Sequence, residues 1–207
     1  MKKIILVLGL VYWMVLLSNS IPAQDRCEAP TLNVGDTWRY RDQGGKEWNR
    51  KVLSIEGDIY VISDRTYYGR QNLGYDKNTF NLDFIIEKDG RRTKFRGARG
   101  KVLDFPLLIG KKWSHLIRVL PKKGRGMAIE KNFREDLSVS AYEDVKVAAG
   151  TFKAFKIEYQ NMDMGSTLQS ARGAYWYSPE IKAVVKRTEE IGLAKGDWEL
   201  VSYKLKQ

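Results

Sequence analysis

The stretch that decides the fold is residues 80–96, which read FNLDFIIEKDGRRTKFR. Every second residue at its start is apolar: Phe80, Leu82, Phe84 and Ile86. A period of two is typical of a strand that buries one face. The run reaches Asp89 and Gly90, a pair that accepts the positive φ angles of a type I′ turn, and a second β-rich run follows at 92–96. The stretch therefore predicts a β-hairpin.

The same pattern continues along the chain. Residues 51–55 and 59–62 flank a Glu-Gly-Asp turn and predict a second hairpin. Further β-rich runs follow at 113–120, 137–142, 152–160, 174–177, 183–188 and 198–205. Only residues 132–136 and 189–195 leave room for short helices. The sequence predicts an all-β fold, an antiparallel meander that forms a strongly curved sheet or incomplete barrel, with at most one or two short helices.

The first 23 residues have the character of a secretory signal peptide. Two lysines precede an apolar run at residues 4–17, and small and polar residues follow as far as Ala23. The run is shorter than the about 20 residues that a membrane-spanning helix needs. We expect cleavage after Ala23 or after Ser20. The mature chain is then periplasmic or secreted from a bacterium, with no transmembrane segment.

Residues 24–207 contain no long linker or low-complexity segment, so we expect a single β-domain. One short motif occurs twice: Leu-x-Val-Gly-x-x-Trp at 32–38 returns as Leu-x-Ile-Gly-x-x-Trp at 107–113. Two interpretations remain open. Either the domain has two related halves, or both copies use the same residues to enter a strand, with Gly permitting a turn and Trp burying a large ring.

Apolar residues at strand positions are expected to be mostly buried. They are Trp38, Trp113, Phe152, Phe155, Ile157, Trp176, Val184 and Trp198.

The chain has one cysteine and one histidine, which excludes a disulfide scaffold and a polyhistidine metal centre. We expect Cys27 to be a free thiol in a loose N-terminal arm, with a disulfide-linked dimer as the alternative. We interpret His115 as a strand histidine, because its neighbour Ser114 points to the opposite face of the sheet. No catalytic residue, cofactor or metal site is predicted.

Three motifs occur in a fixed order: G-x-x-W-x-Y at 35–40, V-x-V-x-A-G-T-F-x-A at 145–154, and Y-W-Y-S-P at 175–179. Together they resemble uncharacterised secreted or periplasmic bacterial β-proteins and lipoproteins of unknown function. The resemblance implies an exported envelope protein with an antiparallel β fold, and it supplies no catalytic residues. The chain departs from the lipoprotein members at residues 24–26, since Gln, Asp and Arg precede Cys27 where lipid attachment requires small and apolar residues.

Positive charge is concentrated in one segment. Residues 86–125 hold 13 basic and 3 acidic residues, whereas the rest of residues 24–207 carries a net charge of −1. The candidate anion-binding residues in this segment are Arg91, Arg92, Lys94, Arg96, Lys122, Lys123 and Arg125. A basic face attracts anionic partners, here anionic lipid, lipopolysaccharide or acidic glycan. Nucleic acid is not expected, because few aromatic side chains accompany the charge. The alternative interpretation is that these basic residues lie on a solvated edge of the sheet and prevent aggregation with other sheets.

These observations favour an exported, non-catalytic envelope β-domain that binds an anionic or amphiphilic ligand through its basic face. An alternative remains open. A hydrolase acting on an envelope polymer can assemble two carboxylates from separate strands, and their separation cannot be read from sequence.

Replacing Arg92, Lys94 and Arg96 together by Gln is expected to weaken binding to anionic vesicles, because the variant loses three charges from one strand. Wild-type binding should fade as added salt shortens the screening length below about 10 Å. Vesicle flotation measures both effects. Equal binding by the two proteins would leave protection of the sheet edge as the role of these charges.

Overall fold

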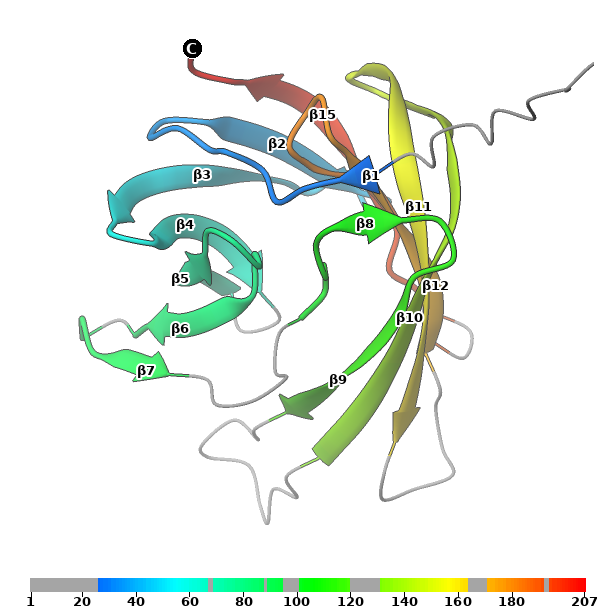
Figure 1. Cartoon of the computed structure of the whole chain (residues 1–207), viewed down its shortest axis with the longest axis horizontal. Coiled ribbons are helices and arrows are strands. Elements are labelled where there is room, and N and C mark those ends of the chain that lie inside the picture. The colour runs from blue at the N-terminus through cyan, green and yellow to red at the C-terminus, as the bar shows by residue number, and fades with distance from the viewer. Residues whose placement is uncertain are drawn as a thin grey trace, which may run out of the picture.

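The computed structural model describes residues 26–66, 69–87, 89–94, 101–119, 131–163, 171–191 and 194–207. Within these ranges every regular element is a strand, and all strand pairs are antiparallel (Figure 1). The predicted all-β fold is confirmed. The two segments considered for short helices, 132–136 and 189–195, lie in strands wherever they are described. The described part of the chain accordingly contains no helix with the length and hydropathy that crossing a membrane requires.

The strands, in chain order, are β1 (Arg26–Cys27), β2 (Thr37–Asp42), β3 (Glu47–Glu56), β4 (Ile59–Thr66), β5 (Gly69–Asp76), β6 (Leu82–Ile86), β7 (Arg92–Lys94), β8 (Leu107–Leu108), β9 (Lys112–Val119), β10 (Lys131–Val147), β11 (Gly150–Asp163), β12 (Ala171–Ser178), β13 (Ala183–Ile191), β14 (Ala194–Lys195) and β15 (Trp198–Lys204). Strands β1 and β8 form a small separate sheet. The other 13 strands form one sheet in the order β7-β6-β5-β4-β3-β2-β15-β13-β12-β11-β10-β9, and β14 pairs with β13.

The large sheet consists of two meanders joined at its centre. From β2 the chain runs strand by strand out to β7, crosses to β9 at the other edge, and returns strand by strand to β15, which pairs with β2. Among the described residues β7 and β9 do not pair with each other, so the sheet is curved but open. The two meanders lie on opposite sides of the segment that carries β8 (Figure 1).

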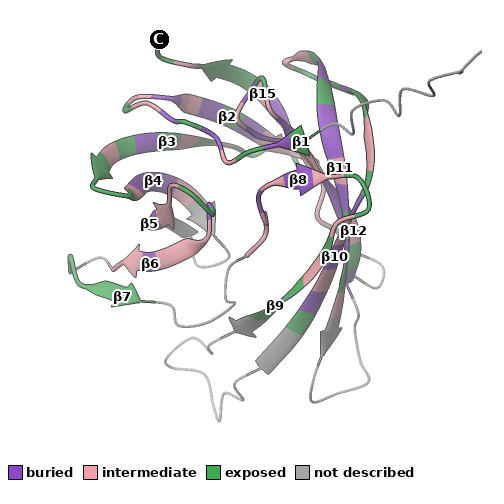
Figure 2. Ribbon diagram, in the orientation of Figure 1, coloured by how far each residue is buried: buried purple, intermediate pink, exposed green. Residues whose placement is uncertain are grey.

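Residues 101–111, which we call the crossing segment, fill the inside of this curve. Alternate side chains of the segment are buried: Leu103, Phe105 and Leu107. The ring of Phe105 lies 6.1 Å from that of Phe80 in the first meander and 5.2 Å from that of Tyr177 in the second. The crossing segment therefore joins the two meanders through one hydrophobic core. Figure 2 shows the buried residues in purple on both meanders and on β8.

The predicted hairpin at residues 80–96 forms between β6 and β7, with Gly90 at φ 84° in its turn. One detail of the prediction is wrong, because Phe80 precedes β6 and lies in a turn with φ 57°. The side chain of Asp76 stabilises this turn by accepting hydrogen bonds from the amides of Asn78 and Thr79. A positive φ is unusual and strained for a bulky residue. Phe80 adopts it nevertheless, and its side chain is buried.

Five of the eight residues expected in the core are buried: Trp38, Phe152, Phe155, Ile157 and Val184. The other three, Trp113, Trp176 and Trp198, are partly buried and pack against this core. Trp113 lies on the edge strand β9. The indole of Trp176 donates a 2.9 Å hydrogen bond to the exposed Glu143, so its position is at the surface. Trp198 lines a cavity described below.

The interpretation of Cys27 is also corrected. It is a free thiol, as expected, but it lies in β1, pairs with Leu107 and is buried. Burial, together with the neighbouring Glu28, raises the pKa of the thiol to about 11. Both effects disfavour the reactive thiolate, so the structure does not favour a disulfide-linked dimer.

The two copies of the repeated motif make the same turn. Gly35 and Gly110 have φ angles of 95° and 86°, and their amides donate 2.9 Å hydrogen bonds to the carbonyls of Val52 and Val139. Each valine amide donates back to the residue after the glycine, and each valine is followed by an irregularity in strand register. The relationship between two halves of the domain stays a prediction, because strand entry alone also explains this geometry.

Replacing Leu107 by Ala is expected to lower the free energy of unfolding by about 2–5 kcal/mol, because its fully buried side chain leaves a cavity between the two meanders. Ile109→Ala, two residues away, is the matched control. That side chain is 39% exposed, and its removal should change stability by no more than about 0.5 kcal/mol. Urea denaturation measures both. Equal losses would show that the crossing segment does not hold the core together.

Candidate ligand-binding site

The candidate anion-binding residues that the structure describes lie on an edge strand of the sheet and not among the residues that line a pocket. Arg91, Arg92 and Lys94, which we call the basic edge, are exposed on or beside β7. Arg92 forms an ion pair with Glu56 at 2.8 Å and lies over the ring of Phe84. The other candidates, Arg96, Lys122, Lys123 and Arg125, lie outside the described residues. A single basic face formed by all seven candidate residues therefore stays a prediction. The edge position suits the alternative role of blocking strand pairing.

A cavity of about 350 Å³ lies on the inner side of the curved sheet, and we call it the inner cavity. Its volume is at the lower end of the range for small-molecule sites. Six aromatic side chains line it: Tyr40, Trp48, Tyr75, Phe80, Tyr175 and Trp198. Aliphatic side chains, including two from the crossing segment, complete the apolar part of the wall. Arg50, Asp64 and Arg187 provide its charged groups.

One wall of the inner cavity is an aromatic cluster at the junction of the two meanders. Tyr40 on β2 faces Trp48 on β3 directly across the strand pair, and their rings stack at 5.5 Å. Trp198 on β15 packs edge-on against both rings, at 5.0 Å and 6.0 Å. The strand pairing between β15 and β2 therefore brings together aromatic residues from the beginning and the end of the described chain.

Arg50, on β3, lies in the part of the wall formed by the first meander. Its Nε atom is 3.5 Å from the Asp64 carboxylate, and its guanidinium lies 5.5 Å and 5.8 Å from the ring centres of Tyr75 and Phe80. Burial alone would lower the pKa of Arg50, but the charge of Asp64 and the neighbouring tyrosines together outweigh it and hold that pKa above its ordinary value. Burial also raises the pKa of Tyr75 to about 12. Arg50 is therefore a charged group fixed against aromatic rings.

Arg187, on β13, has equivalent surroundings in the second meander. It forms an ion pair with Glu189, and its guanidinium lies 5.7 Å and 5.5 Å from the ring centres of Tyr159 and Tyr175. The Tyr159 hydroxyl donates a 3.1 Å hydrogen bond to the same Glu189. Gly173 makes this reach possible, because a Cβ atom at that position would lie 2.7 Å from the Tyr159 hydroxyl.

The inner cavity does not contain the pair of facing carboxylates that a glycoside hydrolase needs. Of its described lining residues only Asp64 is acidic, and it lies beside Arg50. A larger open groove, of about 1120 Å³, lies over strands β9–β13 and contains several acids. Those on its exposed surface form ion pairs such as Lys156–Glu158 and Arg172–Glu190. A general acid requires a more enclosed setting that raises its pKa, so these paired surface acids do not favour the hydrolase alternative. We therefore place the candidate ligand-binding site in the inner cavity.

His115 is a buried strand histidine, and Ser114 is exposed on the other face of β9, as expected. The structure adds a partner that the sequence did not indicate. Nε2 of His115 lies 2.5 Å from Oε2 of Glu135, on the neighbouring strand, and both side chains are almost fully buried. This contact occupies one ring nitrogen of His115 and links the edge strand β9 to β10.

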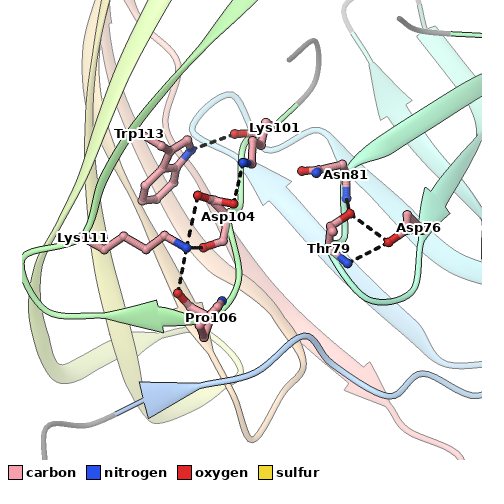
Figure 3. A network of polar contacts seen from close by, with 8 residues as sticks. All are labelled: Asp76, Thr79, Asn81, Lys101, Asp104, Pro106, Lys111 and Trp113. Atoms are coloured by element: carbon pink, nitrogen blue, oxygen red, sulfur yellow. Dashed lines mark hydrogen bonds and ion pairs between the residues drawn. The ribbon is translucent and has the colours of Figure 1, made fainter. Parts of the chain in front are cut away.

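Polar contacts within the crossing segment, and one from Trp113 on β9, fix the conformation of this segment beside the inner cavity (Figure 3). The Lys111 ammonium donates to the carbonyl of Asp104 and, at 3.0 Å, to that of Pro106, and it lies 3.2 Å from the Asp104 carboxylate. Lys101 also pairs with Asp104, at 2.7 Å, and the Trp113 indole donates to the carbonyl of Lys101 at 2.9 Å. These contacts surround the part of the crossing segment whose side chains line the cavity.

Sequence reasoning missed Arg50 and Arg187 because both lie outside the basic window at 86–125. A signal was present for Arg50. It shares the inward-facing alternation of β3 with Trp48 and Val52, where a charged residue is out of place. A charge at an inward position is the pattern that would have identified it.

Replacing Lys111 by Met is expected to lower the free energy of unfolding by about 1.5–3 kcal/mol, because the hydrogen bonds it removes involve a charged donor. Lys112→Met is the matched control, since the Lys112 side chain is exposed. Thermal and urea denaturation measure both variants. A loss at Lys111 no larger than that at Lys112 would contradict the proposed role of this network.

No family model matches the chain, and no curated protein matches it. Solved structures similar to it include three bacterial proteins. A presumed lipoprotein from Parabacteroides distasonis has 16% identity and a TM-score of 0.49, covering 87% of this chain and all of that one. The hypothetical lipoprotein YmcC from Escherichia coli has 11% identity and a TM-score of 0.46, and the match covers 81% of this chain and 84% of that one. A presumed exported protein with a YmcC-like fold from Bacteroides fragilis has 15% identity and a TM-score of 0.39, and the match covers 86% of this chain and 99% of that one.

Proposed function

We propose that this protein is exported to the bacterial periplasm or secreted, and that it binds a small amphiphilic molecule in the inner cavity without catalysing a reaction. The signal-peptide character of the first 23 residues supports export. The observation that carries the binding role is the inner cavity itself, about 350 Å³ in volume and lined by aromatic, aliphatic and a few charged side chains. This combination is characteristic of small-molecule binding sites.

The walls of the inner cavity are rigid enough to form a site before a ligand arrives. Tyr40 and Trp48 face each other across paired strands. Phe80 is held at φ 57°, a strained conformation that persists only where the surroundings enforce it. Its ring stacks on Tyr75 at 5.2 Å and contacts Phe105 of the crossing segment. A site of this kind loses little conformational freedom when a ligand binds.

The basic edge has a separate role in this proposal. It brings the protein to an anionic surface formed by anionic lipid, lipopolysaccharide or acidic glycan. The support is positional, because β7 pairs with β6, and β6 contributes Leu82 to the wall of the inner cavity. The basic edge therefore borders the meander that holds much of the cavity.

The neutral fluorescent probe N-phenyl-1-naphthylamine tests the binding role. Wild type should bind it with an increase in fluorescence, because its rings leave water for an apolar site. Leu82→Trp narrows the inner cavity and should weaken the affinity about ten-fold or more, since overfilled sites reject ligands. Leu53→Trp is the control, because Leu53 is 38% exposed on β3.

Fluorescence titration gives the dissociation constants, and circular dichroism establishes that both variants are folded. No binding by wild type, or equal binding by the two tryptophan variants, would rule out the inner cavity as the site. Native mass spectrometry of protein purified from its own periplasm would then show whether any lipid or glycan accompanies it.

A further inference from the structure

Two guanidinium groups line the inner cavity, and each comes from a different meander. Arg50 belongs to the first and Arg187 to the second, and their side chains retain 15% and 23% of their exposure. Both positions are far from the basic window in sequence. Each arginine has a carboxylate partner, as buried charges require, and both still line the same small cavity.

We infer that the ligand of the inner cavity carries an oxyanion head group, a carboxylate or a phosphate, and that Arg50 and Arg187 bind it. This inference rests on the proposed function and names the chemistry of the ligand. Oxyanions suit a guanidinium because its planar N–H groups donate two parallel hydrogen bonds to them. The apolar body of the ligand would lie against the aromatic and aliphatic walls.

Both arginines have donors available for such a head group. The buried Nε atom of Arg187 has no hydrogen-bond acceptor among the described residues, and the buried Nε atom of Arg50 lies 3.5 Å from the Asp64 carboxylate without forming a hydrogen bond to it. A buried donor without an acceptor is unfavourable, so a site that contains two is better satisfied when an acceptor enters. Nε and its neighbouring Nη form one of the edges through which guanidinium binds a carboxylate.

Both arginines are also fixed in place before a ligand binds. Arg50 lies against the stacked pair of Tyr75 and Phe80, and Arg187 against the stacked pair of Tyr159 and Tyr175. Each arginine also has a carboxylate beside it. This support reduces the conformational freedom that a long side chain loses on binding.

Hydrogen-bond donors, rather than net charge, favour an anion in the inner cavity. Arg50 is paired with Asp64 and Arg187 with Glu189, so the two ion pairs together carry no net charge. Both arginines line the cavity, whereas Glu189 is not among its lining residues. The guanidinium N–H groups are therefore the groups that an oxyanion can bind there.

Three ligands with the same twelve-carbon chain test the inference: dodecanoate, dodecyl phosphate and dodecanol. Calorimetric titration of wild type should give an affinity for dodecanoate or dodecyl phosphate at least about ten-fold higher than for dodecanol. The more tightly bound of the two anions identifies the head group. Lowering the pH until dodecanoate is protonated should remove its advantage over dodecanol, while dodecyl phosphate, which stays ionised, is the control for titration of the protein's own carboxylates.

Arg50→Gln and Arg187→Gln should each weaken binding of the preferred anion about ten-fold and leave dodecanol affinity within about two-fold. Arg50→Lys should restore part of the loss, since it keeps the charge but not the planar donor edge. Arg39→Gln is the matched control, because Arg39 is exposed on the other face of β2. Circular dichroism and thermal melting establish folding of each variant.

Equal wild-type affinity for the anions and for dodecanol would overturn the inference while leaving the proposed function intact. Parallel loss of anion and dodecanol binding in the Gln variants would also overturn it, because the arginines would then act only as structural ion pairs. No binding of any of the three compounds, together with no binding of the neutral probe, would overturn the proposed function itself.

Discussion

An open, strongly curved sheet must have its inner face covered, and in this protein the chain itself provides the cover. The crossing segment passes between the two meanders and buries Leu103, Phe105 and Leu107 against both of them. Its position is fixed by β8, which pairs with β1, and by the indole of Trp113 on β9, which donates to the carbonyl of Lys101. The meanders are hydrogen-bonded to each other through β15 and β2, so the crossing segment supplies the second link between them. The burial of Cys27 follows from the same constraint.

The inner cavity exists because this cover is incomplete. Two side chains of the crossing segment reach one side of it, and the aromatic cluster at the junction of the meanders closes another. Two arginines remain inside, each with a carboxylate and a pair of aromatic rings. A buried ion pair is poor evidence for stability, because desolvating two charges offsets much of their attraction. For this reason we propose that the two arginines recognise a polar group of a ligand, rather than act only as stabilising ion pairs.

Positive charge has two different settings in this molecule. The high density of Lys and Arg at residues 86–125 is visible in sequence, and two of these residues, Arg92 and Lys94, are exposed at the edge strand β7. Exposed charges of this kind are screened by salt and contribute to attraction over a distance. Arg50 and Arg187 are ordinary in sequence, yet they lie inside the fold, where screening is weak and geometry can be selective. The density of Lys and Arg in the sequence identified the basic edge, whereas the charged groups of the inner cavity became visible only in the folded structure.

The sequence by itself determined the strands and their turns, because the alternation of apolar residues and the positions of Gly are local properties. Hairpins at Gly57 and Gly90 and the all-β class followed directly. It could not determine that β15 pairs with β2, nor that the crossing segment enters the curve, because both depend on contacts between residues far apart in the chain. The same limit applies to Cys27, to Phe80 and to the pairing of His115 with Glu135. The inner cavity is the clearest case, since its walls come from both meanders and only their packing brings Arg50 and Arg187 to one site.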